Sequence, residues 1–433
     1  MPTSIRPATG RPQAVPQRRR PGIDSVWWLI AVAGAFTLVQ VLLVAPRLGL
    51  SWDEIVYVSQ VSVHAPASIF GPPRARGISL LVAPVTELTS SVLALRIYLS
   101  IMSGAALLAA MLVWRRVRPA WLVALAGLLF ASLWVTLYYG SEAMPDLWVA
   151  LSALAAVGFF LQVADPGRPA LDGAPATGRV KGSLTGLAAC LAVAALVRPG
   201  DAIFLAAGIV VAVVVVRRWR RWPLLAATAA GVVAGAAEWV IEAYVRFGGP
   251  LQRLHGAAQE QGGLAPHLGL LYQLHAVTGP TLCRPCTMTI RSPGLSLWWL
   301  AAPVLAVLGI MAARGAGRMA SSALAGFCAL CIGFQYLFLI NYAAPRFLLP
   351  FYALLSIPVA DALGWLVTGV RADLRPMSAA LLAGILAAQV ILSAGAGDIA
   401  TVATDNVGHL ARFVDAQPWE KITPVIWTSV RFA

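Results

Sequence analysis

The sequence predicts an all-α polytopic membrane protein, because its composition, its apolar runs and the placement of its charges agree. Of its 433 residues, 59% are hydrophobic and only 12% are charged, whereas a soluble domain carries roughly 25% charged residues. The apolar residues form long runs, and a helix of roughly 20 such residues crosses a bilayer. The formal net charge is +14, but the basic residues stand in short clusters between the runs. Such clusters are typical of topology signals, so we expect no nucleic-acid partner.

About eleven apolar runs are candidate membrane-spanning helices. They lie near residues 26–45, 92–113, 121–138, 147–163, 184–197, 201–216, 223–245, 296–313, 320–340, 347–369 and 377–395. The stretch from Gly77 to Leu88 is also apolar, but it is short and Pro84 interrupts it. We therefore expect a re-entrant or interfacial helix there, and extracytoplasmic juxtamembrane helices in the first loop.

The remaining segments complete the expected domain organisation. Residues 1–25 are rich in Pro and Arg and predict a disordered cytoplasmic tail, and the first span is too long for a cleavable signal peptide. Residues 26–395 form the transmembrane domain, with long outer loops at about 46–91 and 246–295. Residues 396–433 predict a short extracytoplasmic tail, too short for a further domain.

The positive-inside rule sets the expected orientation. With the amino terminus in the cytoplasm, every cytoplasmic connection carries basic residues, including Arg115, Arg116 and Arg118 between the second and third spans. The chemically interesting residues then share the extracytoplasmic side: Asp53, Glu54, Glu142, Asp146, Arg198, Asp201 and Arg346. We expect a multi-pass protein of the cell membrane whose functional site faces outward.

Two adjacent carboxylates, Asp53 and Glu54, follow the first span directly. They either cap a juxtamembrane helix or form part of a functional site, because ionised groups at the edge of the hydrocarbon are costly. The same loop carries Tyr57, Arg74 and Arg76.

Three further turns on this side carry charge. The turn after the third span contains Glu142 and, behind Pro145, Asp146, which is either a helix-dipole partner or a second functional acid. Arg198 stands in a tight turn and Arg346 opens a late span. Each arginine is either an interfacial anchor or a ligand for an anion.

These motifs, taken in chain order, resemble the GT-C superfamily of polytopic glycosyltransferases. The acidic pair is followed by a basic Gly/Pro loop and by LALRIYLSIMSG at the second span. SEAMPDLWVAL follows the third span, LVRPGDAIFL forms the fifth-to-sixth turn, and APRFLLPFYALL opens a late span. The resemblance covers roughly residues 26–370. It is strongest to the protein O-mannosyltransferases and the aminoarabinose transferase of lipid A.

The resemblance implies a sugar donor carried on a polyprenyl phosphate in the membrane and transferred on the outer face. It makes Asp53 the catalytic acid of the first loop and matches Asp146 to the second acid. Arg346 matches the arginine of a late RYLLP-like motif, in which this chain has Phe347 in place of Tyr. The carboxy-terminal soluble domain of several members has no counterpart, so we expect the loops to recognise the acceptor.

The chemistry of this reaction fits the residues without the family name. One positioned carboxylate acts as general base on the acceptor hydroxyl, and cations stabilise the departing phosphate. Asp53 is the expected base, and Glu54 would orient it or raise its pKa. The expected substrate-binding residues are Arg74, Arg76, Arg198, Arg346, Glu142 and Tyr57. A double displacement, with Asp146 on the other face of the sugar, stays open.

The metal requirement also stays open at this point. Asp53, Glu54, Glu142 and Asp146 could form an oxygen-rich site for Mg²⁺ or Mn²⁺, although no cofactor is firmly expected.

The second long loop holds His255, His267, His275 and the pair Cys283 and Cys286. The cysteine pair indicates a disulfide or free thiols. The His and Cys side chains could instead bind a metal, although their spacings match no common site. Glu238 and Glu242 share a helix face and either line the cavity or pair with Arg198 or Arg246.

Two functions from different classes compete. The first is a glycosyltransferase that moves mannose, or a pentose such as arabinose, to a cell-envelope glycan, lipid or protein. The second is a transporter or flippase for a lipid-linked envelope precursor, which would hold its ionisable residues near mid-membrane. A family member that only scaffolds other enzymes is a third possibility.

Overall fold

The computed structural model describes residues 25–165, 176–277, 282–283, 293–389 and 391. The expected tails, Cys286 and the end of the last expected span lie outside these residues. The first half of the chain forms α1 Trp27–Val39, a π-helix Gln40–Val44, a 3₁₀ turn Ala45–Arg47, α2 Trp52–Ser59, α3 Gly77–Thr86, α4 Val92–Arg115, α5 Ala120–Ala131, α6 Trp134–Gly140, α7 Pro145–Ala164 and α8 Ala176–Val197.

The second half is equally helical. It contains α9 Pro199–Val215, a 3₁₀ turn Arg217–Trp219, α10 Trp222–Arg246, α11 Pro250–Gln261, α12 Leu270–Ala276, α13 Pro293–Ala312, α14 Met319–Phe338, a 3₁₀ turn Pro345–Leu348, α15 Leu349–Thr368 and a 3₁₀ turn Ala372–Leu374. Residues 375–389 are helical as well. The described residues contain no β-strand beyond one isolated bridge, between Cys283 and Ala343.

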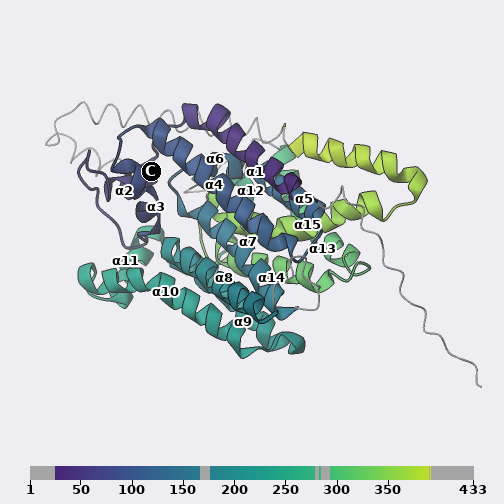
Figure 1. The fold of residues 1–433 in the computed structure, drawn as a ribbon. Coiled ribbons are helices and arrows are strands. Elements are labelled where there is room, and N and C mark those ends of the chain that lie inside the picture. The colour runs from purple at the N-terminus through teal and green to yellow at the C-terminus, as the bar shows by residue number, and fades with distance from the viewer. Residues whose placement is uncertain (1–24, 166–175, 278–281, 284–292, 390, 392–433) are drawn as a thin grey trace, which may run out of the picture.

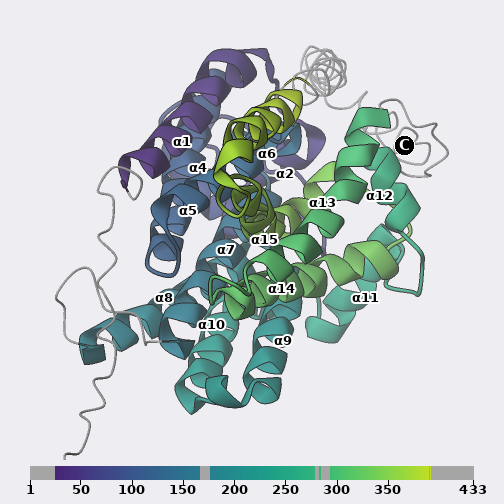
Figure 2. The ribbon, with the colours of Figure 1, turned by 90° about the vertical axis from the view of Figure 1, so that its right-hand side faces the viewer.

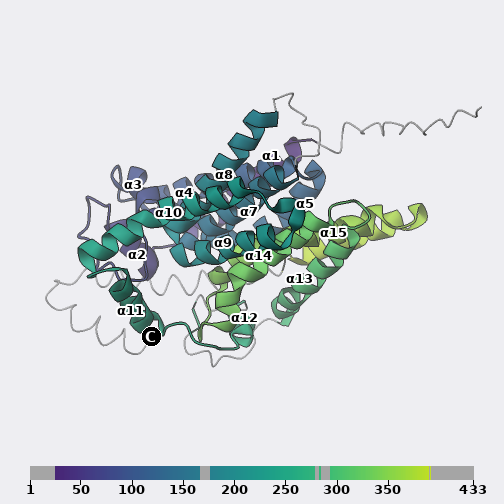
Figure 3. The same cartoon turned by 90° about the horizontal axis from the view of Figure 1, so that it is seen from below.

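A helix occupies each of the eleven ranges predicted to span the membrane. By length and composition, seven helices among the described residues can cross a membrane, or eight if the bent pair α5 and α6 counts as one span. The expected all-α polytopic membrane fold is therefore confirmed. The helices expected in the first loop are present as α2 and α3, which lie with α11 at the left end of the bundle in Figures 1 and 3.

The third expected span, residues 121–138, is not one straight helix. It breaks into α5 and α6, which are bent by 78°. The Gln389 amide donates to the carbonyl of Leu129 (2.7 Å) and to the Ser132 hydroxyl (2.6 Å), and the Leu133 amide bonds to Phe130 instead. A side chain that takes a ladder carbonyl is a recognised cause of helix kinks.

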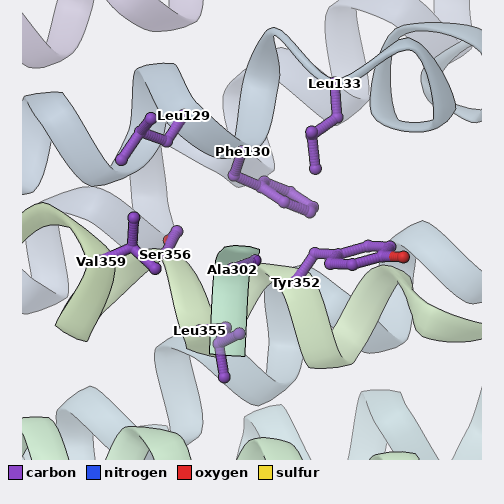
Figure 4. Close-up of a pocket in the computed structure, with 8 residues that line it drawn as sticks. All are labelled: Leu129, Phe130, Leu133, Ala302, Tyr352, Leu355, Ser356 and Val359. Carbon is purple, nitrogen blue, oxygen red and sulfur yellow. The ribbon is translucent and has the colours of Figure 1, made fainter. Parts of the chain in front are cut away.

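A small apolar cavity of about 20 Å³ lies beside this break, enough for about one water molecule. Figure 4 shows Leu129, Phe130 and Leu133 on one side and Tyr352 and Ser356 of α15 on the other. The break thus packs directly on α15, the helix at the middle of the bundle in Figure 2.

Helices α8 and α10 pack through small residues. A Cβ on Gly231 would lie 2.4 Å from the carbonyl oxygen of Ala188, and one on Gly235 would lie 2.1 Å from that of Ala192. This small-xxx-small pairing brings two backbones together, as is common between membrane helices. It fixes α10, whose far end supports the first loop.

Candidate functional site

The site begins at the first turn of α2, where the two neighbouring carboxylates have separate surroundings. Glu54 is fully buried and forms a two-pronged ion pair with the guanidinium of Arg96 on α4. It also accepts hydrogen bonds from the Ser51 amide (2.9 Å), the Ser51 hydroxyl (3.0 Å) and the Ala143 amide (2.7 Å). Glu54 therefore ties α2 to α4 and to the turn before α7.

Asp53 points to the other side and keeps 33% of its side chain exposed. Its Oδ1 accepts from Arg74 Nη2 at 2.7 Å, and its Oδ2 accepts from Arg346 Nη2 at 3.0 Å. Burial raises the pKa of Asp53, but the guanidinium groups of Arg346 and Arg74 outweigh it and leave the pKa below its ordinary value of 3.8. The carboxylate is therefore ionised near neutral pH.

A row of alternating charges continues from Asp53. Arg346 Nε also lies 3.5 Å from Asp146 Oδ2, and Asp146 pairs through Oδ1 with Arg198. Arg198 Nε in turn lies 3.7 Å from Asp201 Oδ2. Asp53, Arg346, Asp146 and Arg198, predicted from four separate segments, thus form one cluster.

The elements that supply this cluster present their ends to it. Asp146 is in the first turn of α7, Arg198 is the residue before α9, and Arg346 lies in the 3₁₀ turn that opens α15. The amino-terminal ends of helices carry partial positive charge. They and the arginines together favour an anion at this place.

Two further predicted residues border the cluster. Tyr57 is buried one turn after Asp53, and burial raises the pKa of its hydroxyl to about 12. Glu142 lies in the turn before α7, where its Oε1 has no hydrogen-bond partner among the residues that the structure describes. Burial, followed by repulsion from Glu54, raises the pKa of Glu142 well above its ordinary value of 4.5.

Arg76 does not join the cluster around Asp53. Its guanidinium binds Glu242 on α10 at 2.6 Å and 2.9 Å and Gln60 at 2.8 Å. Glu242 also pairs with Arg253 at 2.8 Å and lies 3.7 Å from Arg246, one of the two partners expected for it. Arg76 therefore connects the first loop to α10.

Several buried polar residues at the site escaped the sequence reasoning. Arg96 and Arg253 are fully buried. Gln335 and Tyr336 of α14 donate to Asp201 at 2.6 Å and 2.5 Å. Arg96 could have been predicted from the sequence, because an arginine four residues inside an apolar helix needs a buried acidic partner. Arg253 had none, since its helix has a polar sequence.

The oxygen-rich metal site that the sequence left open has no structural counterpart in the described part of the chain. No three His, Cys, Asp or Glu side chains come together there in a way that could hold a metal ion. Asp53, Glu54 and Asp146 each face guanidinium groups, and this donor set does not fit a divalent cation.

Cys283 is disulfide-bonded, whereas Cys190, Cys328 and Cys331 are free.

A second ionic cluster lies at the opposite ends of the helices. Asp361, near the end of α15, pairs with Arg118 at 2.5 Å and with Arg318 at 3.4 Å. Ser322 donates to the same carboxylate at 2.5 Å. This cluster joins the α4–α5 connection to α14 and α15.

Comparisons with known proteins identify the fold. No protein-family model matches the chain, and no curated protein sequence matches it. Among solved structures, ArnT from Cupriavidus metallidurans bound to undecaprenyl phosphate is similar with a TM-score of 0.60 at 17% identity, over 90% of this chain and 79% of that one. Its apo form gives 0.56 at 16% identity, over 88% and 74% of the two chains.

A more distant structure has the same architecture. The oligosaccharyltransferase AglB from Archaeoglobus fulgidus, in complex with an inhibitory peptide and a dolichol-phosphate, gives a TM-score of 0.51 at 16% identity, over 86% of this chain and 56% of that one. The fold expected from the motifs is therefore confirmed.

Proposed function

We propose that this chain, a multi-pass membrane protein with the GT-C fold, is a glycosyltransferase. It transfers a sugar from a polyprenyl-phosphate donor to a hydroxyl group of a cell-envelope acceptor. The observation that carries the proposal is the cluster at one end of the bundle, in which a partly exposed carboxylate, Asp53, contacts Arg74 of its own loop and Arg346 from a distant segment. The ArnT structure contains undecaprenyl phosphate and the AglB structure a dolichol-phosphate, which supports this class of donor.

In the proposed reaction Asp53 is the general base. Asp53 takes the proton from the acceptor hydroxyl while the hydroxyl oxygen bonds to the anomeric carbon of the sugar. At the same time the bond between the anomeric carbon and the phosphate oxygen breaks. The electron pair leaves with the phosphate, whose growing charge is met by Arg346, Arg198 and Arg74. A single displacement inverts the anomeric centre.

The other acids have distinct parts in this proposal. Glu54 is a positioning residue, because both of its oxygens are engaged by Arg96 and backbone amides. Asp146, buried and paired with two arginines, holds their guanidinium groups toward the phosphate. A double displacement would instead require the Asp146 carboxylate to reach the sugar.

The location of the cluster favours the enzyme over a transporter. Asp146, Arg198 and Arg346 all stand at the beginnings of helices and not at their middles. The opposite ends of the helices are held together by the buried ion pair of Arg118 and Asp361. A transporter needs a mid-membrane site that opens to both faces.

We further propose that the cluster faces the extracytoplasmic side. The connections at the other ends of the helices carry Arg115 and Arg116, the Arg217–Arg221 group and Arg314. By the positive-inside rule these connections are cytoplasmic.

The test is transfer by the purified protein from a panel of polyprenyl-phosphate sugars, with mannose and arabinose donors included, to an envelope extract. Asp53→Asn keeps the shape of the side chain but removes the base, so transfer should fall by about 10²- to 10⁴-fold. Glu87→Gln is the matched control, because Glu87 is an exposed acid at the end of α3. Transfer by Asp53→Asn at the wild-type rate would refute the assignment of the base.

A further inference from the structure

A fully buried arginine from a distant helix holds the backbone of the loop that carries Arg74. Arg253 of α11 donates through Nε to the carbonyl of Pro72 (3.0 Å) and through Nη2 to that of Arg74 (2.8 Å). It also donates to the Trp239 carbonyl (2.7 Å) and to Glu242 Oε2 (2.8 Å). One side chain thus joins α10 and α11 to two carbonyls of the first loop.

Glu242 provides a second connection to the same loop. Its Oε1 accepts from Arg76 Nε at 2.9 Å and Nη2 at 2.6 Å, and the Arg76 guanidinium stacks 3.8 Å from the centre of the Phe70 ring. The loop is therefore held on both sides of Arg74, and the Arg74 guanidinium contacts Asp53.

The placement of α11 depends on these contacts, because glycine pairs interrupt the backbone at both of its ends. Gly248 and Gly249 before the helix have φ of 76° and 121°, and Gly262 and Gly263 after it have φ of 87° and 72°. Positive φ costs most residues free energy but is free for glycine. The helix is not continuous from α10 to α11. The Gly249 amide donates to the Ala243 carbonyl at 2.8 Å, and the contacts of Arg253 add to this link.

We propose that Arg253, held by Glu242, is a positioning residue that sets the place of the Arg74 guanidinium against Asp53. The inference rests on the proposed function, since it assigns Arg253 an effect on transfer that passes through Arg74. Only arginine suits this position, because its rigid fork of donors reaches two loop carbonyls and a carboxylate together. A lysine would retain the charge beside Glu242 but could not make the same set of bonds.

A double-mutant cycle between Arg253 and Arg74 tests the proposal. kcat and KM for the donor are measured for the wild type, Arg253→Met, Arg74→Ala and the double variant. Arg253→Met should lower kcat/KM by about 10- to 100-fold, since displacement of a catalytic group by about 1 Å has effects of this size. In the Arg74→Ala background the same change should cost less than about twofold, because coupled residues are not additive.

Two further variants separate positioning from general stability. Arg246→Met is the matched control, because Arg246 also faces Glu242 on α10 but is 57% exposed; it should keep wild-type kinetics. Arg253→Lys retains a buried cation, and it should keep the unfolding temperature nearer the wild-type value while losing kcat/KM as Arg253→Met does.

A measurement without turnover keeps this inference separate from the proposed function. Hydrogen exchange at the amides of residues 74–76 should accelerate in Arg253→Met and not in Arg246→Met. Additive losses in the cycle, or unchanged exchange at these amides, would overturn the inference. If the purified protein transferred no sugar from any donor, the proposed function would fail, and hydrogen exchange alone would still decide whether Arg253 holds the loop.

Discussion

Asp53 and Glu54 are adjacent in sequence but face different surroundings, because consecutive residues of an α-helix point about 100° apart. Glu54 turns inward to Arg96, and Asp53 turns to the edge of the bundle, where Arg74 and Arg346 meet it. Removing one partner of a buried ion pair typically costs about 3–5 kcal/mol. The acidic residue Glu54 thus stabilises the fold, whereas in our proposal its neighbour Asp53 takes part in the reaction.

Glu142 gives a pH-dependent prediction. Burial and repulsion from Glu54 hold its pKa in the folded protein above its ordinary value of 4.5, so the folded state binds a proton that the unfolded state releases. The free energy of unfolding must therefore fall as pH rises from about 4.5 toward the folded pKa. Glu142→Gln resembles the protonated acid, and it should match the wild type at about pH 4 and become more stable than the wild type at about pH 8.

Thermal unfolding in detergent at the two pH values measures this difference. Glu87→Gln is again the control, since an exposed carboxylate should give no pH-dependent difference. A constant difference between Glu142→Gln and the wild type across the pH range would contradict the raised pKa.

At this scale the sequence predicted the charged residues that stand at the starts of spans. Asp53, Asp146, Arg198 and Arg346 could be named because charge at the membrane border is rare and stands out. The sequence analysis named Asp53 as the base and Glu54 as the residue that orients it. It did not separate Arg74 from Arg76, because a shift of one or two residues decides which side of the loop a side chain faces. Arg253 was missed because nothing local marks a residue whose partners are 179 and 181 positions away.

Among the elements, the contact between α8 and α10 depends most clearly on single atoms. A methyl group on Gly235 would lie 2.1 Å from the carbonyl oxygen of Ala192, so Gly235→Ala must push two backbones apart. We expect a loss of about 1–3 kcal/mol, the usual range for overpacking, seen as a lower unfolding temperature.

The control for this substitution lies on α8 itself. Gly182 is exposed and helical, and no atom of the described residues would lie within 4 Å of a Cβ added there. Gly182→Ala should leave the protein unchanged or more stable by about 0.5–1 kcal/mol, because alanine loses less backbone entropy in a helix. Equal effects of the two substitutions would show that the close contact is not a constraint.

The positions of the helices were predictable because hydrophobic runs of the right length are visible in the sequence. The break between α5 and α6 was not, since Gln389, whose side chain takes the Leu129 carbonyl there, lies more than 250 residues further along the chain. Local sequence at residues 121–138 contains no proline that would mark a kink.

For the whole molecule, the two ionic clusters mark the two opposite ends of the helix bundle. The proposed orientation places these ends on different sides of the membrane, so a thiol reagent can distinguish them. Glu87→Cys places a thiol on the exposed end of α3, and Gly315→Cys places one in the exposed connection between α13 and α14. A membrane-impermeant thiol reagent should label Glu87→Cys in intact cells and Gly315→Cys only after permeabilisation.

The parent chain is the control for this labelling, because Cys328 is buried and Cys190 and Cys331 are half-buried. The opposite labelling pattern would place the Asp53 cluster on the cytoplasmic side. The clustering of basic connections supports the proposed orientation, and it could be predicted from the sequence because topology signals are compositional.

The contacts of Asp53 have a consequence for the timing of the proposed reaction. The guanidinium groups that keep this carboxylate from accepting a proton are the ones an arriving phosphate would attract. As Arg74 and Arg346 turn to the phosphate, Asp53 loses its counterions and its affinity for a proton rises. Asp53 would thus become a strong base only when the lipid-linked donor is bound, and it would stay a weak base in the absence of the donor.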